Sequence, residues 1–365
     1  MTFPTSPLSE VATLLSGGTP SKADPGLWDG RIPWVSPKDM DQWLLDDTED
    51  HIASAAIGNG TRLAPVGATL IVVRSMGLAS RVQIAFPTRD VAFNQDLKAV
   101  VPKPGIQPRF LFYALAAARP RIHEQVDEAS HGTKRIQTHV LEKLPIPVPA
   151  EVTQTAIAMM LGVLDDKIGL NMRTQSTLFE MAQATFDSVL LAATDLPLVP
   201  LRDAVDFAYG KALRADGRHA GPVTVMGSNG PIGVHNEMLV DGPGIVIGRK
   251  GNPGIVTWVD KAFWPIDTTF FVKPLDGWSL PYLFFELCRL DLPRLAADSA
   301  VPGLNRDIAL STPIRKATES IQRKLAADVL PMFALREGLR VESAILGELR
   351  DALLPELISG RMTVN

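Results

Sequence analysis

The sequence predicts an α+β protein built from two similar mixed α/β units, each followed by a long helix. Two observations support this architecture. An ordered set of short strand, helix and loop patterns occurs twice, about half a chain apart. Each set then leads into a long tract in which apolar residues have helical spacing. With 365 residues, the chain is long enough for two or three domains.

The chain begins with a turn-rich segment, Gly17–Met40, that is dense in glycine and proline. Trp28 and Trp34 are too large and too apolar to remain in water, so this segment must fold onto the body of the protein. We expect the two indoles to anchor a rigid loop. Small or basic side chains would then project from it, namely Thr19, Ser21, Lys22 and Lys38.

The clearest repeated pattern is an apolar strand, an Arg and a Gly, and then a second strand. It occurs at 68–86 and again at 242–260, which makes Arg74 and Arg249 equivalent. A short amphipathic helix follows each copy, and after it come a polar Gly turn, a basic residue and a Pro-closed strand. These later matches pair 108–122 with 280–295, and 130–149 with 299–314. The common order predicts an internal duplication with a pseudo-two-fold relation.

A long helix is expected to close each copy. Apolar residues recur in alternating steps of three and four, which is typical of a coiled-coil seam. The predicted seam residues are Leu161, Leu164, Ile168, Leu178 and Met181, then Ile321, Leu325, Met332, Leu335, Leu339, Leu346, Leu349 and Leu353. Pro331 should end or kink the second helix. We expect the two helices to pack together and to space the two units apart, with two core helices of an ordinary domain as the alternative.

Charge is unevenly distributed along the chain. The net charge is −4, but residues 60–149 carry twelve Lys and Arg against six Asp and Glu. This distribution favours a basic face on the first unit, with chance scatter as the alternative. A basic face is the usual electrostatic footprint of nucleic-acid binding.

Several classes of protein lack their sequence patterns here. No apolar run is long enough for a membrane span, and the N-terminus lacks the regions of a secretory signal, so we expect a cytoplasmic protein with Cys288 as a buried thiol. The six His are dispersed, and neither a P-loop nor a dinucleotide fingerprint occurs, so no metal or cofactor is expected. Asp165 and Asp166 are adjacent on a helix and point apart, so they cannot form an acid/base couple.

Three segments resemble the DNA-specificity subunit of type I restriction-modification systems. Residues 8–40, LSEVATLLSGGTPSKADPGLWDGRIPWVSPKDM, are similar to the opening of a target-recognition domain. Residues 144–186, beginning LPIPVPAEVTQTAIAMM, are similar to the central spacer helix and its proline-rich lead-in. Residues 246–274, beginning VIGRKGNPGIV, are similar to the core of a second recognition domain.

The resemblance implies target-recognition domains at 1–150 and 195–317, and antiparallel spacer helices at 151–194 and 318–365. Each domain would read one half of a split DNA target. Two adenine-N6 methyltransferase subunits, which would bind S-adenosylmethionine, would dock on the chain, and two motor-nuclease subunits could join. The chain itself would be non-catalytic.

Two departures from the family pattern stand out. The usual Glu-Gln pair after the prolines is Thr153-Gln154 here, and the second lead-in, 310–322, has lost most of its prolines. The docking surface at the second half is therefore expected to be less regular.

Polar and basic loop residues are the expected DNA contacts, because major-groove readout uses such side chains on loops held by a rigid scaffold. They are Thr19, Ser21, Lys22, Lys38, Arg74, Ser75, Ser130, His131, Thr133, Lys134, Arg135, Ser228, Asn229, Arg249, Lys250, Asn252, Asn305 and Arg306. Exposed helix residues expected to bind the methyltransferases are Asp165, Asp166, Lys167, Arg173 and Glu180. A coiled-coil adaptor that binds only proteins, and an enzyme with its pocket between the units, are the alternatives.

Overall fold

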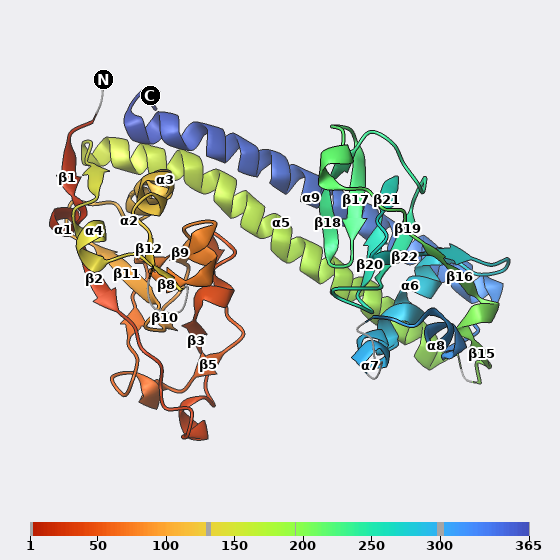
Figure 1. The fold of residues 1–365 in the computed structure, drawn as a ribbon. Coiled ribbons are helices and arrows are strands. Elements are labelled where there is room, and N and C mark those ends of the chain that lie inside the picture. Colours follow the sequence, from red (N-terminus) through yellow and green to blue (C-terminus); the bar gives the residue numbers. More distant parts are fainter. Residues whose placement is uncertain (1–2, 129–132, 194, 298–302, 365) are drawn as a thin grey trace. The chain divides into compact units, whose positions relative to one another are not determined.

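A computed structural model describes residues 3–128, 133–193, 195–297 and 303–364. The chain divides into two compact units, drawn in Figure 1. Unit 1 comprises Met1–Leu170 and Glu342–Asn365, and unit 2 comprises Asn171–Val341. No helix in the described ranges combines the length and the apolar character that crossing a membrane requires.

Unit 1 is a set of small sheets packed on short helices. The largest sheet has the strand order β2-β11-β7-β9-β4, and a second has the order β5-β3-β10-β6. Its elements are β1 (Thr5–Pro7), α1 (Leu8–Val11), β2 (Ala12–Ser16), β3 (Ile32–Val35), β4 (Leu44–Leu45), β5 (His51–Ile52), β6 (Leu63–Ala64), β7 (Thr69–Val72), β8 (Arg74–Ser75), β9 (Ile84–Pro87), β10 (Val91–Phe93), β11 (Leu97–Pro102), α2 (Pro108–Ala117), α3 (Arg119–His123), β12 (Asp127–Glu128), β13 (Lys134–Arg135), α4 (Thr138–Glu142) and β14 (Pro145–Pro147).

Unit 2 repeats this plan with fewer strands. Its main sheet has the order β16-β22-β19-β20, beside a smaller sheet of order β18-β17-β21. Its elements are β15 (Leu198–Pro200), β16 (Val205–Tyr209), β17 (Val223–Gly227), β18 (Gly230–His235), β19 (Gly244–Gly248), β20 (Val256–Val259), β21 (Phe263–Pro265), β22 (Thr269–Pro274), α6 (Leu280–Arg289), α7 (Leu292–Ala297), α8 (Arg306–Ser311) and β23 (Pro313–Arg315).

Matching hydrogen bonds confirm the predicted duplication. The side-chain oxygen of Gln154 accepts from the backbone N–H of Gln107 at 2.9 Å, and that of Gln322 accepts from the N–H of Ser279 at 2.7 Å. The amide nitrogen of each Gln donates to two backbone carbonyls at matching places in the fold, those of Gly105 and Pro149 in unit 1 and those of Gly277 and Ala317 in unit 2. Each copy thus fastens its lead-in segment to the first turns of its long helix in the same way.

Helix α5 (Glu151–Ala192) and helix α9 (Glu319–Ser359) are the two predicted long helices, and they pack together antiparallel within each unit. In unit 1, Leu161 of α5 shares a core with Leu354 and Leu357 of α9. In unit 2, Phe186 of α5 shares a core with Val329 of α9. Their apolar contacts join the helices to the sheets as well as to each other.

Of the two predicted effects of Pro331, an end of the second helix is contradicted, because α9 continues through this residue, and a kink stays a prediction. An internal proline costs a helix about 3 kcal/mol. Burial of Val329 and Phe333 in the core of unit 2 outweighs this cost, while Pro331 itself is exposed. The predicted seam was also partly wrong, since Met181, Leu335 and Leu349 are 46–51% exposed.

Two further expectations need correction. The segments 130–149 and 299–314 each contain a short helix, α4 and α8, where only a turn and a strand were predicted. Cys288 is exposed rather than buried, because α6 turns Leu283 and Leu287 toward the core instead.

Candidate nucleic-acid interface

The loop at Gly17–Met40 is held in place by its two tryptophans, as predicted. The rings of Trp28 and Trp34 meet edge-on with centroids 5.0 Å apart. Each indole N–H donates to a loop carbonyl at 3.1 Å, Trp28 to Ser21 and Trp34 to Gly18. The ammonium of Lys22 lies 6.0 Å from the Trp28 ring. The loop is therefore a preformed surface feature and not a flexible strap.

Two other loop residues expected to contact DNA already have partners in unit 1. Thr19 Oγ1 donates to Gln95 Oε1 at 2.6 Å. Lys38 Nζ lies 2.8 Å from Glu49 and 2.9 Å from Asp50, and these hydrogen bonds raise the pKa of its ammonium. Lys38 thus faces carboxylates and would have to exchange them for a phosphate.

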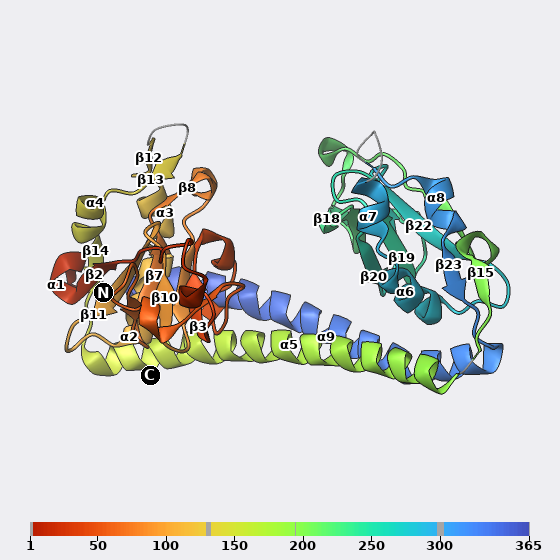
Figure 2. The same ribbon diagram turned by 90° about the horizontal axis from the view of Figure 1, so that it is seen from below.

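Strands β8 and β13 bring two separate predicted regions together. Arg74 pairs with Arg135 and Ser75 pairs with Lys134 in a small sheet with β12. Figure 2 shows β8, β12 and β13 side by side at the end of unit 1 away from α5. Thr133 directly precedes this sheet, whereas Ser130 and His131 lie outside the described residues. The cluster is formed by segments that are remote in sequence.

Carboxylates orient the cations of this cluster. Arg74 Nε donates to Asp96 Oδ1 at 2.6 Å, and Lys134 Nζ lies 3.0 Å from Glu128. The Arg74 side chain remains half-exposed, and its terminal nitrogens make no hydrogen bond to any residue that the structure describes, while Ser75 Oγ accepts from the Gly77 N–H. Sequence reasoning missed Asp96 and Glu128, because no local pattern links them to the cations that they orient.

The corresponding loops of unit 2 also converge. A Cβ on Gly248 would lie 2.0 Å from the carbonyl oxygen of Asn252 and 3.0 Å from that of Ser228, so only glycine allows this approach. The backbone N–H of Leu304 donates to the carbonyl of Arg249 at 2.9 Å. Ser228 and its neighbour Asn229 form the turn between β17 and β18. Lys250 and Asn252 are exposed at the centre of this cluster.

The register between the repeats corrects the predicted equivalence of Arg74 and Arg249. The N–H groups of Val73 and Arg74 both donate to the carbonyl of Asp96, at 2.8 and 3.2 Å. In unit 2 the N–H groups of Arg249 and Lys250 donate in the same way to Thr268, at 2.9 and 3.1 Å. Lys250 is therefore the counterpart of Arg74. The alignment was one residue out because the linking loops differ in length.

Arg249 occupies the position that buried Val73 fills in unit 1, which explains its surroundings. Its guanidinium lies 5.3 Å from the ring centroid of Tyr209 and 6.0 Å from that of Phe270. Its Nε is buried and has no hydrogen-bond partner among the described residues. Stacking on an aromatic ring orients a guanidinium and leaves its terminal nitrogens to bind another group.

Asn305 and Arg306 have structural roles, which their prediction as DNA contacts did not anticipate. Asn305 caps α8, its Oδ1 accepting from the N–H groups of Asp307 and Ile308 at 3.0 and 3.1 Å. Arg306 donates to the carbonyl of Phe207 at 2.9 Å and pairs with Asp206. Both residues fasten α8 to the sheet of unit 2.

The helix residues expected to bind partner subunits divide into two groups. Asp165 was predicted on an exposed flank, but its side chain is 2% exposed and bound to Arg350. Asp166 pairs with Arg109 at 2.6 Å, and Lys167 pairs with Glu342 at 3.2 Å. The buried face of α5 therefore includes a carboxylate that the seam pattern placed outside. The two remaining predicted residues are exposed, Arg173 and Glu180.

Comparison with known proteins identifies the first half of the chain. Residues 2–178 match the family described as Type I restriction modification DNA specificity domain. The EcoR124I/EcoR124II specificity subunit of Escherichia coli is 33% identical over 160 residues, which are 43% of this chain and 40% of the relative. The MjaIX specificity subunit of Methanocaldococcus jannaschii is 26% identical over 179 residues, with 47% and 40% covered. The matches thus span about two fifths of the length of these curated relatives.

The fold is similar over nearly the whole chain to the crystal structure of a type I system S subunit from M. genitalium. The TM-score is 0.62 and the identity 16%, with 98% of this chain and 96% of that one covered. The two mixed units with paired long helices are the architecture that the sequence predicted. The first half of the chain is thus similar to type I restriction-modification specificity subunits.

Proposed function

We propose that this chain reads a bipartite double-stranded DNA target, one half with each unit, and directs adenine-N6 methylation by partner subunits. Two methyltransferase subunits, carrying S-adenosylmethionine, would bind the helices, and two motor-nuclease subunits could join to restrict unmethylated DNA. The chain would act inside the cell without a cofactor of its own.

The observation that carries this proposal is that both units present a loop cluster at equivalent places in the fold. Unit 1 offers Arg74 and Arg135, and unit 2 offers Lys250 and Asn252. Basic side chains supply salt-dependent affinity for phosphates, and Arg or Asn side chains can read base edges with paired hydrogen bonds. Sheets fixed by buried cores hold these loops, so their geometry would be set before DNA binds.

The two clusters differ in chemistry, which supports half-sites of different sequence. Arg74 is oriented by Asp96, whereas its counterpart Lys250 has no ion-pair partner among the residues described. Arg249, whose guanidinium lies 5.3 Å from the Tyr209 ring centroid, stands where unit 1 has the apolar Val73. An arginine fork suits O6 and N7 of guanine, and Asn252 has the groups to read adenine.

The helices would fix the spacer between the half-sites. Helix α5 is continuous over 42 residues, and each unit packs on a different part of it. The exposed residues Arg173 and Glu180, with exposed apolar neighbours such as Met172 and Met181, would contribute to partner binding. Shortening α5 should shift or abolish recognition of the spacer.

Mapping N6-methyladenine across the genome, with the chain present and deleted, tests the proposal while the methyltransferase is retained. We expect a bipartite motif to lose its methylation on deletion. The adaptor alternative predicts an unchanged methylome. The adaptor alternative also predicts that the purified complex does not bind DNA, whereas a DNA reader should bind DNA with an affinity that falls as the salt concentration is raised.

A further inference from the structure

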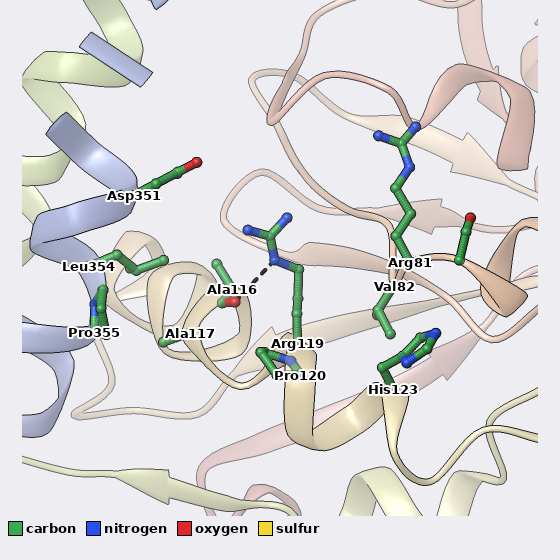
Figure 3. Close-up of a pocket in the computed structure, with 11 residues that line it drawn as sticks. Arg81, Val82, Ala116, Ala117, Arg119, Pro120, His123, Asp351, Leu354 and Pro355 are labelled. Carbon is green, nitrogen blue, oxygen red and sulfur yellow. Dashed lines mark hydrogen bonds between the residues drawn. The ribbon is translucent and has the colours of Figure 1, made fainter. Parts of the chain in front are cut away.

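Unit 1 contains a cavity of about 500 Å³ that the DNA-reading loops do not use. Figure 3 shows its walls, which come from α2, α3, the segment around Arg81, and the end of α9. The recognition domain and the long helix therefore form this cavity jointly. Its apolar side is lined by Val82, Ala117, Leu354 and Pro355.

Cationic side chains line the opposite side. Arg119 Nε donates to the carbonyl of Ala116 at 3.1 Å, and no carboxylate lies within ion-pair distance of Arg119 among the described residues. Burial lowers the pKa of this guanidinium, with Arg350 and Arg81 adding repulsion and Asp351 opposing it. His123 Nε2 is buried without a hydrogen-bond partner in the described part of the chain.

Two carboxylates near the cavity, one of them the lining residue Asp351, are each bound to an arginine through one oxygen. Asp351 accepts from Arg350 Nε and Nη2 at 2.9 and 2.8 Å, and Asp41 accepts from Arg81 at 2.5 Å. Arg119 thus has no carboxylate partner, and His123 Nε2 has no hydrogen-bond partner, among the described residues, and both side chains lie beside an apolar wall. A half-buried guanidinium and a buried imidazole nitrogen both favour an external anion.

We propose that this cavity binds an acidic side chain carried on an apolar segment of the partner methyltransferase subunit. The carboxylate would accept from Arg119 and His123, and the apolar part of the segment would pack on Leu354 and Pro355. The cavity suits this occupant by charge complementarity, and its wall on α9 is continuous with the helices proposed to bind that partner. The inference rests on the proposed function.

The test is the affinity of the purified full-length chain for its methyltransferase, measured by titration with the labelled enzyme. Arg119→Glu should raise the Kd by about tenfold or more, because the partner's carboxylate would meet a like charge. Ala117→Trp should weaken binding by filling the cavity while leaving Arg119 in place. Arg121→Glu is the matched control, since Arg121 is exposed on the same short helix and does not line the cavity.

The outcomes separate this inference from the proposed function. If the unsubstituted chain binds no methyltransferase, both fail. If it binds, and Arg119→Glu and Ala117→Trp bind within about twofold of the Arg121→Glu control, the cavity is not the docking site and only the inference falls. The guanidinium of Arg119 also lies 4.8 Å from the Trp43 ring centroid, so Arg119→Glu removes this packing contact as well. If that variant unfolds, Ala117→Trp still tests the cavity, because it leaves Arg119 unchanged.

Discussion

Arg350 of α9 binds Asp165 of α5 through an Nη1 to Oδ1 contact of 2.7 Å, inside the core of unit 1. The other oxygen of Asp165 accepts from the Tyr113 hydroxyl at 2.6 Å, and burial beside this carboxylate raises the pKa of Tyr113. The guanidinium of Arg350 also lies 3.5 Å from the ring centroid of Trp43. One buried ion pair therefore joins both helices to Tyr113 of α2 and to Trp43 in unit 1.

Removing one member of this pair should strongly destabilise unit 1. Arg350→Met leaves the Asp165 carboxylate buried without its cation, which typically costs about 3–5 kcal/mol. Lys167→Met, which breaks the exposed pair with Glu342, should cost about 0–1 kcal/mol. Urea unfolding of both variants measures the difference. Equal losses would mean that the buried pair has no special role.

The hydrogen bonds of Gln154 and of Gln322 should contribute equally to the stability of their units. Gln154→Ala or Gln322→Ala removes three hydrogen bonds to the backbone, and we expect a loss of about 1–3 kcal/mol in either case. Amide hydrogen exchange should rise at Gln107 in the first variant and at Ser279 in the second. Gln42→Ala, at an exposed position, serves as the control, and exchange that rises equally in both units would contradict the assignment.

Glu286 should make the stability of unit 2 depend on pH. Its side chain is 2% exposed, and burial raises the pKa of its carboxyl above the ordinary 4.5. The stability that the protonated carboxyl contributes is fully present below the pKa of the unfolded chain, and it is lost as the pH rises through the higher pKa of the folded protein. Glu286→Gln should therefore gain stability relative to the parent as the pH rises above the ordinary value of about 4.5, because the parent must then ionise a buried carboxyl and the variant does not. A difference in melting temperature that stays constant with pH would refute this reading.

The first loop should depend on Gly18. A Cβ at this position would lie 2.0 Å from the carbonyl oxygen of Gly60, so Gly18→Ala must displace backbone. We expect lower stability and weaker binding of the half-site read by unit 1. Gly26→Ala is the control, because its Cβ would meet only Asp24 Oδ1, at 3.3 Å. Indistinguishable DNA affinity of the two variants would remove the loop from the interface.

Order and periodicity in the sequence were enough to predict the duplication, the paired helices and the Trp28–Trp34 anchor. They could not predict which face of a helix is buried where polar residues enter the core. Counted along each helix from the equivalent residues Gln154 and Gln322, Asp165 and Phe333 occupy the same position of the repeat. This buried position therefore holds a carboxylate in unit 1 and an aromatic ring in unit 2. Tertiary partners such as Arg350 decide this choice, and they are remote in sequence.

The site was predicted less completely than the fold for the same reason. Loop position identified Arg74 and Lys250 as surface cations, but their equivalence needed the strand register. Arg306 looked like a free cation in sequence, and only the folded unit pairs it with Asp206. Local composition finds candidate residues, whereas long-range pairing decides which of them remain available.

Replacing the exposed loop of unit 2 and reading the target motif again tests the central claim most directly. The variant Lys250→Ala with Asn252→Ala alters only unit 2, and its methylation map should change in one half of the bipartite motif while the other half and the spacer persist. A map with both halves unchanged, from a complex that still assembles, would contradict the account.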